Sequence, residues 1–132
     1  MKAKKNEGKA SRTFVICKER SVVGYYTLAL GSLYHCEAMG KLKRNMPDPI
    51  PAMILGRLAM DTKFQNRGLG SALLKDAIQR TLIVCKHAGT RALIVHALNH
   101  KAKEFYIHHG FKESPTGEST LMLPIEEITY NL

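Results

Sequence analysis

The residues with the clearest chemical potential form a polar, glycine-rich loop, Gln65-Asn66-Arg67-Gly68-Leu69-Gly70-Ser71. The loop follows an apolar run at residues 53–60 and precedes an amphipathic stretch that predicts a helix from about Leu69 to Ala88. Two glycines let the backbone approach a ligand, and the free N–H groups of a helix start point at whatever binds there. The helix dipole and Arg67 both add positive charge. The loop therefore predicts a site for a phosphate or pyrophosphate.

Two common phosphate-binding motifs do not fit this loop. The phosphate loop of nucleotide triphosphatases needs Gly-Lys-Ser/Thr after four spacer residues, and the Lys is missing here. The dinucleotide fingerprint needs a third glycine, where Leu73 stands, and an acidic residue at the end of the next strand. That strand instead ends in His96-Ala97-Leu98-Asn99. What remains is Gln-x-x-Gly-x-Gly between a strand and a helix.

A second block of residues follows after one predicted helix and one predicted strand. It reads Asn99-His100-Lys101-Ala102-Lys103-Glu104-Phe105-Tyr106-Ile107-His108-His109-Gly110-Phe111. Together, and in this order, the two blocks resemble the GNAT superfamily of N-acetyltransferases. Its acyl-CoA loop is Gln-x-x-Gly-x-Gly, and its later segment is Asn-x-x-Ala-x-x-Phe-Tyr-x-x-x-Gly-Phe. The resemblance implies a GNAT-like α/β fold, a mixed central β-sheet flanked by helices, with acetyl-CoA as cosubstrate.

The resemblance also assigns the residues that would bind acetyl-CoA. Strand residues would pair with the pantetheine through their backbone, the glycine loop would hold the pyrophosphate, and Asn99 would contact the cofactor near its reactive end. The full set is Leu58, Ala59, Met60, Gln65, Asn66, Arg67, Gly68, Leu69, Gly70, Ser71, Asn99 and Phe105. Without the resemblance, Leu58 and Met60 would simply be sheet core, and Asn99 would be a helix cap.

Acetyl transfer from a thioester to an amine needs alignment, a neutral amine and a proton for the departing thiolate. A free α-amino group has a pKa of about 8, so a weak base or a water suffices to deprotonate it. In the GNAT-like motif, the tyrosine at the position of Tyr106 lies beside the thioester sulfur, which makes Tyr106 the candidate catalytic acid. The alternative is a core aromatic, because Ala102 and Phe105 on the same predicted helix look buried.

The formal charge of +9 is concentrated in the N-terminal part of the chain. Residues 1–46 hold ten lysines and arginines against three acidic residues, a net of +7; the remaining residues hold ten against eight, a net of +2. A basic part beside a nearly neutral part favours a polyanionic partner, nucleic acid first. The alternatives are a solubilising surface or partial neutralisation of bound CoA.

Residues 9–15, 44–51, 55–59 and 95–98 resemble the GNAT toxins of bacterial type II toxin–antitoxin systems. That family acetylates the α-amino group of the amino acid on a charged tRNA, which blocks translation. Its antitoxin is typically a ribbon-helix-helix protein, and its toxin is usually a homodimer. The resemblance thus implies aminoacyl-tRNA as the substrate, bound through its phosphates. The candidate contacts are Lys9, Arg12, Lys41, Lys43, Arg44 and Arg57.

Toxins of this family usually begin with a further strand and one or two helices before the segment that matches residues 4–15. We therefore expect an N-terminally short chain, either a truncated product or a shortened natural variant, whose sheet edge and acceptor groove lose cover. Two other functions stay open. One is a GNAT enzyme for a protein N-terminus, lysine or small amine; the other is an inactive GNAT domain that binds CoA, RNA or an antitoxin.

Length and composition favour one globular domain over residues 1–132. No apolar run approaches the roughly 20 residues that span a bilayer, and no secretory signal is visible. Cys17, Cys36 and Cys85 are odd in number and show no pairing by spacing. We therefore expect reduced thiols in a cytoplasmic protein, with neither a membrane segment nor a metal site.

Periodicity and turn residues predict the elements that position these groups. Strands are expected at residues 13–17, 22–30, 53–60, 92–95 and 120–123, the first two as a hairpin, and helices at residues 69–88 and 100–109. Residues 1–9 are expected to end a helix at Gly8, and residues 31–46 to be irregular.

Four polar side chains on the two predicted helices are expected at the surface. Asp76 and Arg80 fall on the polar face of the long helix as an i,i+4 pair. His108 and His109 point in different directions from the second helix.

Overall fold

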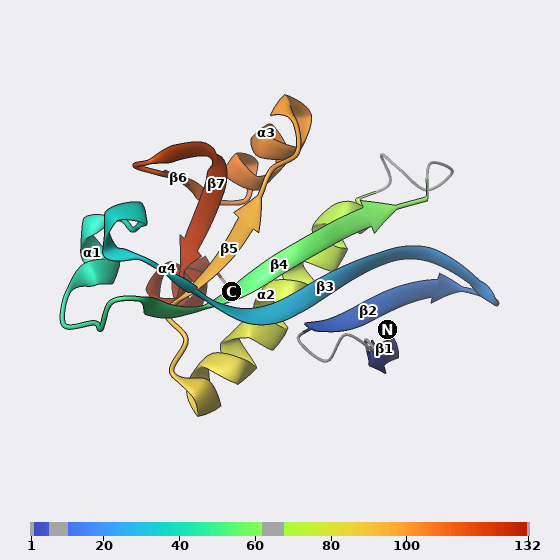
Figure 1. Ribbon diagram of the computed structural model, residues 1–132. Coiled ribbons are helices and arrows are strands. Elements are labelled where there is room, and N and C mark those ends of the chain that lie inside the picture. The colour runs from blue at the N-terminus through green and yellow to red at the C-terminus, as the bar shows by residue number, and fades with distance from the viewer. Residues whose placement is uncertain (1, 6–10, 62–67, 132) are drawn as a thin grey trace.

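A mixed β-sheet of seven strands forms the centre of the computed structural model, which describes residues 2–5, 11–61 and 68–131 (Figure 1). The strand order is β1-β2-β3-β4-β5-β7-β6, and only β4 and β5 pair in parallel. The strands are β1 (Lys2–Lys5), β2 (Ser11–Lys18), β3 (Ser21–Leu33), β4 (Ile50–Met60), β5 (Ala92–His96), β6 (Lys112–Ser114) and β7 (Gly117–Pro124). The helices are α1 (Gly40–Lys43), α2 (Leu69–Ala88), α3 (His100–His108) and α4 (Ile125–Asn131). The expected α/β class, a mixed sheet flanked by helices, is confirmed.

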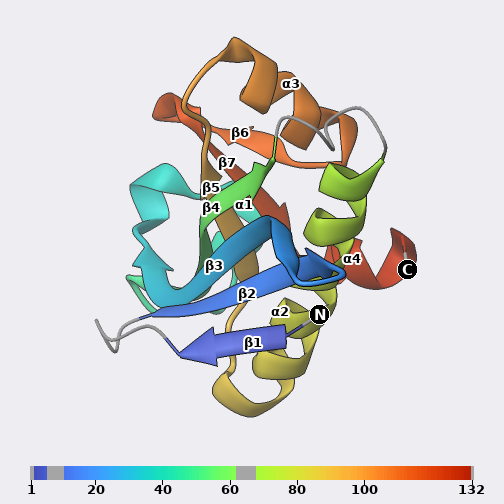
Figure 2. The same cartoon turned by 90° about the vertical axis from the view of Figure 1, so that its right-hand side faces the viewer.

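The sheet separates two apolar clusters. Helices α2 and α1 lie on opposite sides of the strands, as Figure 2 shows. The larger cluster, on the α2 side, includes Tyr26, Leu55, Leu73, Leu74, Leu93, Tyr106, Phe111, Leu121 and Ile128. The smaller, on the α1 side, includes Leu33, Leu42, Ile50, Ile94 and Met122. Because β5 is buried on both faces, its run Ala92–His96 is almost entirely apolar.

Helix α2 has the predicted boundaries because glycine stands at both ends. Gly68 precedes it with φ 74° and Gly89 follows it with φ 68°, both in the left-handed region that favours glycine. The 3.6-residue periodicity buries Leu73, Leu74 and Ala77 completely against the sheet. The start of α2 is therefore fixed in place by the packing of its second and third turns.

The last residues of strand β4 no longer pair with β5, and this separation creates the opening at which the site lies. The two strands pair only from Met53–Leu93 to Leu55–Val95, whereas β4 continues to Met60 alongside β3. A bulge places Gly56 opposite the step from Thr27 to Leu28, and a Cβ on Gly56 would come within 2.6 Å of the Thr27 hydroxyl oxygen. The extra residue shifts the alternation, so Leu58 and Met60 pack toward the α2 side with Leu55.

The N-terminal prediction was wrong. Residues 2–5 form strand β1, paired antiparallel with β2 from Lys2–Val15 to Lys5–Arg12, because pairing at the sheet edge overrides the local helical preference of Lys-Ala-Lys-Lys. Gly8, the expected helix stop, lies outside the described residues.

Three further elements differ from the sequence-based expectation. The short α1 lies within the segment expected to be irregular, and β6 was not expected. The strand expected at residues 120–123 lies within β7, and the unexpected α4 begins directly after it, with Glu126 and Glu127 in its first turn.

Candidate active site

A cavity of about 440 Å³ lies between the end of β4, the start of α2 and the first turns of α3. It is lined by Leu58, Met60, Gly68, Gly70, Ser71, Asn99, Lys101, Ala102, Phe105 and Tyr106. All but Lys101 and Ala102 were predicted from the sequence as site residues. Its volume falls in the range of ligand pockets. The structure thus brings together strand, loop and helix residues that are almost 50 positions apart in the chain, at the opening between β4 and β5.

The start of α2 forms one wall of this cavity. The backbone N–H of Ala72 bonds the Gly68 carbonyl at 3.1 Å, so the N–H groups of Leu69, Gly70 and Ser71 precede the first helical hydrogen bond. These donors and the helix dipole make the wall a site for an anion. Gln65, Asn66 and Arg67, predicted for the same anion, lie outside the described residues.

Tyr106 reaches the same cavity from α3 and is also part of the core. Its side chain is 8% exposed, with its ring edge-on to Phe105 at 5.3 Å and to Phe111 at 5.4 Å. Its carbonyl accepts hydrogen bonds from the N–H groups of His109 and Phe111, which close the end of α3. Burial raises the pKa of the Tyr106 phenol above its ordinary value. The phenol is therefore a protonated, positioned group at neutral pH.

Asn99 both caps α3 and lines the cavity. Its Oδ1 accepts a hydrogen bond of 2.8 Å from the Ala102 N–H. The cap interpretation therefore holds, and the side-chain NH₂ group remains as the donor for a ligand.

Two predicted cofactor residues do not line the cavity. Ala59 falls on the opposite face of β4 from Leu58 and Met60, where it pairs with Tyr25 and borders a separate hollow of about 310 Å³. Leu69, the first residue of α2, is half-buried and absent from the cavity lining. For both, a contact with a ligand in the cavity would have to come from the backbone.

Sequence reasoning missed His109. It was expected at the surface, but its ring is half-buried, edge-on to Phe105 at 4.8 Å, and its Nε2 lies 3.0 Å from the Ser71 Oγ. Burial, and then the neighbouring His108, lower the pKa of His109. The signal was the i,i+4 spacing from Phe105, which puts both rings on one helix face. His108 is exposed, as predicted.

The predicted cationic contacts divide between the two faces of the sheet. Arg57 is exposed and opposite in alternation to Leu58, so it faces the α1 side. Arg12 borders a hollow of about 380 Å³ on the α2 side, together with Arg80. Lys43 lies on α1 and Arg44 follows it, with Lys41 on the same helix. Lys9 lies outside the described residues. The structure therefore does not bring Arg12 to the surface that carries Arg57.

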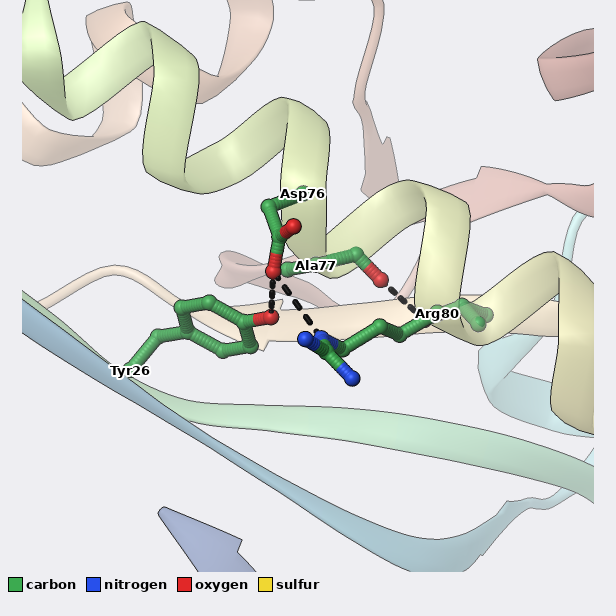
Figure 3. A network of polar contacts seen from close by, with 5 residues as sticks. Tyr26, Asp76, Ala77 and Arg80 are labelled. Carbon is green, nitrogen blue, oxygen red and sulfur yellow. Dashed lines mark hydrogen bonds and ion pairs between the residues drawn. The ribbon is translucent and has the colours of Figure 1, made fainter. Parts of the chain in front are cut away.

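A polar network ties α2 to β3, although Asp76 and Arg80 were expected at the surface on the polar face of the helix. The hydroxyl of the fully buried Tyr26 donates to Asp76, and Arg80 Nε bonds the same carboxylate at 3.0 Å (Figure 3). Arg80 also lies over the Phe14 ring at 4.3 Å. The i,i+4 pair is thus confirmed, but both side chains are half-buried because the network anchors the helix to the sheet.

Across residues 2–5, 11–61 and 68–131 there is no group of three or more His, Cys, Asp and Glu side chains that could hold a metal ion. In the same part of the chain, no helix is long and apolar enough to cross a membrane.

The cavity combines a helix start that is suited to an anion with a buried phenol. The family described as the acetyltransferase (GNAT) domain matches residues 9–113. The chain therefore belongs to the GNAT acetyltransferases, enzymes that use acetyl-CoA as cosubstrate.

Within the GNAT acetyltransferases, the chain is similar to toxins of toxin–antitoxin systems. The chain is 50% identical over 117 residues to a tRNA-acetylating toxin of Mycobacterium tuberculosis (strain ATCC 25618 / H37Rv), covering 89% of this chain and 70% of that protein. Among solved structures, AtaT complexed with acetyl-methionyl-tRNAfMet superposes with a TM-score of 0.86 at 32% identity, over 94% of this chain and 76% of that one. A tyrosine-to-phenylalanine mutant of KacT gives a TM-score of 0.88 at 27% identity, over 96% and 78%.

Proposed function

We propose that this protein is a toxin N-acetyltransferase that moves the acetyl group of acetyl-CoA to the α-amino group of aminoacyl-tRNA and so blocks translation. The observation that carries the proposal is the shared cavity, in which Tyr106 and the start of α2 line one space at the opening between β4 and β5. A thioester carrier needs an anion site at one end and a proton donor at the other, and this cavity offers both.

Acetyl-CoA fits the lining residues in a defined orientation. The diphosphate would lie against the N–H groups that follow Gly68, with the Ser71 hydroxyl beside it. The pantetheine arm would run along Leu58 and Met60, where β4 continues beyond its pairing with β5. A second cavity of about 590 Å³ shares Ser71 and includes Lys75, so there is also space on the far side of the diphosphate.

The reaction needs little from the protein beyond alignment. The neutral α-amine attacks the thioester carbonyl carbon, the carbon–sulfur bond breaks, and the amine loses its proton to water. Tyr106 donates its phenolic proton to the thiolate as it leaves, and recovers a proton from solvent. Burial suits the phenol to this role because it keeps the donor protonated.

The tRNA would approach on the face that carries Arg57. Arg57 lies on β4 itself, while Lys43 and Arg44 lie on and after α1 on the same side of the sheet. Their charges would attract the phosphate backbone without choosing the amino acid. The relative complexed with acetyl-methionyl-tRNAfMet supports this class of substrate.

The proposed partners follow from the relatives. One neighbour is AtaT bound to the C-terminus of the antitoxin AtaR, and we propose a cognate antitoxin here, with a ribbon-helix-helix fold. We also propose a homodimer. Each chain would contribute one domain, because a single sheet runs from β1 to β7.

The decisive experiment is acetylation in vitro. The protein is incubated with charged tRNA and labelled acetyl-CoA, and the labelled aminoacyl species is identified after hydrolysis. The proposal expects label on the α-amine of an esterified amino acid and steep loss of rate with salt. Label on free amines or protein N-termini without any tRNA requirement would instead identify a GNAT enzyme for another amine.

A further inference from the structure

His109, which was not predicted as a site residue, contacts Ser71 of the proposed diphosphate subsite from the side away from the active-site cavity. His109 follows the last residue of α3, and its Nε2 lies 3.0 Å from the Oγ of Ser71, in the first turn of α2. The ring is held edge-on by Phe105, which lines the active-site cavity. Ser71 lines that cavity and the 590 Å³ cavity, whereas His109 lines only the second. His109 can therefore affect a ligand of the first cavity only through Ser71 or Phe105.

Hydrogen-bond chemistry sets the direction of the Ser71–His109 bond when an anion is bound. Phosphate oxygens only accept, so Ser71 must turn its single O–H toward the anion. Ser71 can then only accept from His109, which requires a hydrogen on Nε2. A neutral imidazole has one N–H and can place it on Nε2, and an imidazolium has a hydrogen there as well. Histidine thus suits Ser71 both with and without an anion, because it can donate to or accept from the hydroxyl.

We propose that His109 is a positioning residue for acetyl-CoA: its Nε2–H donates to Ser71 Oγ and directs the Ser71 hydroxyl hydrogen at the diphosphate. This inference rests on the proposed function, since it assumes that an acyl-CoA occupies the cavity. His109 touches neither the thioester nor the acceptor amine in this arrangement. Its effect should therefore fall on cofactor affinity and leave the chemical step nearly unchanged.

The surroundings of His109 favour a hydrogen bond over a charge effect. The titratable groups near it are His108 on its own helix, at 5.3 Å between ring centroids, and Lys75 of α2, which lines the same cavity. Leu123 of β7 and Ile128 of α4 complete that side with apolar groups. Because burial and His108 lower the pKa of His109, the ring is neutral at pH 7.5 and acts through its N–H.

Four variants separate this role from packing. His109→Phe keeps a ring against Phe105 and removes the hydrogen bond, whereas His109→Gln keeps an N–H donor of similar reach. Ser71→Ala removes the group being positioned. His108→Phe, a change of the same kind at the exposed neighbour, is the matched control. Binding of CoA alone is measured by calorimetry at pH 7.5, with thermal melts to compare folding.

We expect His109→Phe and Ser71→Ala each to weaken CoA binding about three- to tenfold, the range for one net hydrogen bond. His109→Gln should recover most of the affinity, and His108→Phe should match the wild type. The double variant His109→Phe/Ser71→Ala should bind no more weakly than Ser71→Ala, because the two groups act in series. In steady-state assays the loss should appear in KM for acetyl-CoA, with kcat nearly unchanged.

Three results would overturn the inference: wild-type affinity in His109→Phe, equal weakening in His109→Gln and His109→Phe, or additive losses in the double variant. If His109→Phe fails to fold, His109→Leu, which also lacks an N–H donor, takes its place, and wild-type CoA affinity in that variant would overturn the inference in the same way. A wild-type protein that does not bind CoA at all would instead refute the proposed function.

Discussion

Replacing Tyr106 with phenylalanine tests the proposed proton donor with the least change to packing. The substitution keeps the ring that lies edge-on to Phe105 and Phe111 and removes one oxygen. None of the described residues forms a hydrogen bond with this hydroxyl, so the free energy of unfolding should change by less than about 1 kcal/mol. CoA affinity should change little for the same reason. Any large effect must then come from chemistry.

The expected loss follows from what the phenol does. A positioned general acid contributes roughly 100- to 10,000-fold, or about 3–5 kcal/mol of transition-state stabilisation. Water entering the cavity replaces it poorly, because Tyr106 is 8% exposed. We expect kcat to fall within that range and KM for acetyl-CoA to stay within about twofold, which is a loss confined to the transition state. Release of free CoA thiol gives the rate directly.

The pH profile adds a second readout. Burial raises the pKa of Tyr106, so its acid form persists through neutral pH and is lost only as pH rises above the ordinary tyrosine value of 10.0. Wild-type kcat should rise as the acceptor amine deprotonates near pH 8 and stay level until the phenol ionises. A Tyr106→Phe enzyme that keeps a third or more of wild-type kcat would refute the acid role.

Three further outcomes follow from the structure. Gly68→Ala forces a left-handed residue at φ 74°, so it should cost about 1 kcal/mol in urea unfolding and weaken CoA binding measurably; an unchanged midpoint would contradict the strain argument. Leu73→Ala should cost about 2–5 kcal/mol, because this side chain is fully buried under β3 and β4. Burial and Asp76 raise the pKa of Tyr26, so its contribution to stability is complete below pH 10.0 and declines as pH rises beyond that; Tyr26→Phe should flatten this alkaline decline in thermal melts.

The long helix and the site around it could be predicted because their signals are local. Glycine on both sides of a strict apolar periodicity is enough to give both ends of α2. The two motif blocks named Gly70 and Tyr106, and the structure brings both to one cavity. The sheet topology then brings the two blocks together, because the parallel strands β4 and β5, which precede them, end at the same edge of the sheet.

The missed features depend on partners distant in sequence. Asp76 is half-buried because Tyr26, 50 residues earlier on β3, bonds it from the face of the sheet that α2 covers. His109 meets Ser71 across 38 residues, a contact that its i,i+4 spacing from Phe105 does not indicate. The strand at residues 2–5 exists through pairing with β2, so helix propensity gave the wrong answer there. Non-local hydrogen bonds of this kind leave no pattern in a single sequence.

The short contact between β4 and β5 has a mechanical consequence. In the described part of the chain, the ladder between β4 and β5 is three residue pairs long, with one more backbone hydrogen bond from the Arg91 N–H to the Pro51 carbonyl, so the β1–β4 and β5–β7 parts of the sheet are joined over a short stretch. An acyl-CoA arm bound there would contact both parts of the sheet. Local opening between β4 and β5 should therefore be rarer when it is present. Amide exchange at Gly56, Leu58 and His96 should slow together on saturation with CoA, while exchange in the β2–β3 hairpin stays the same.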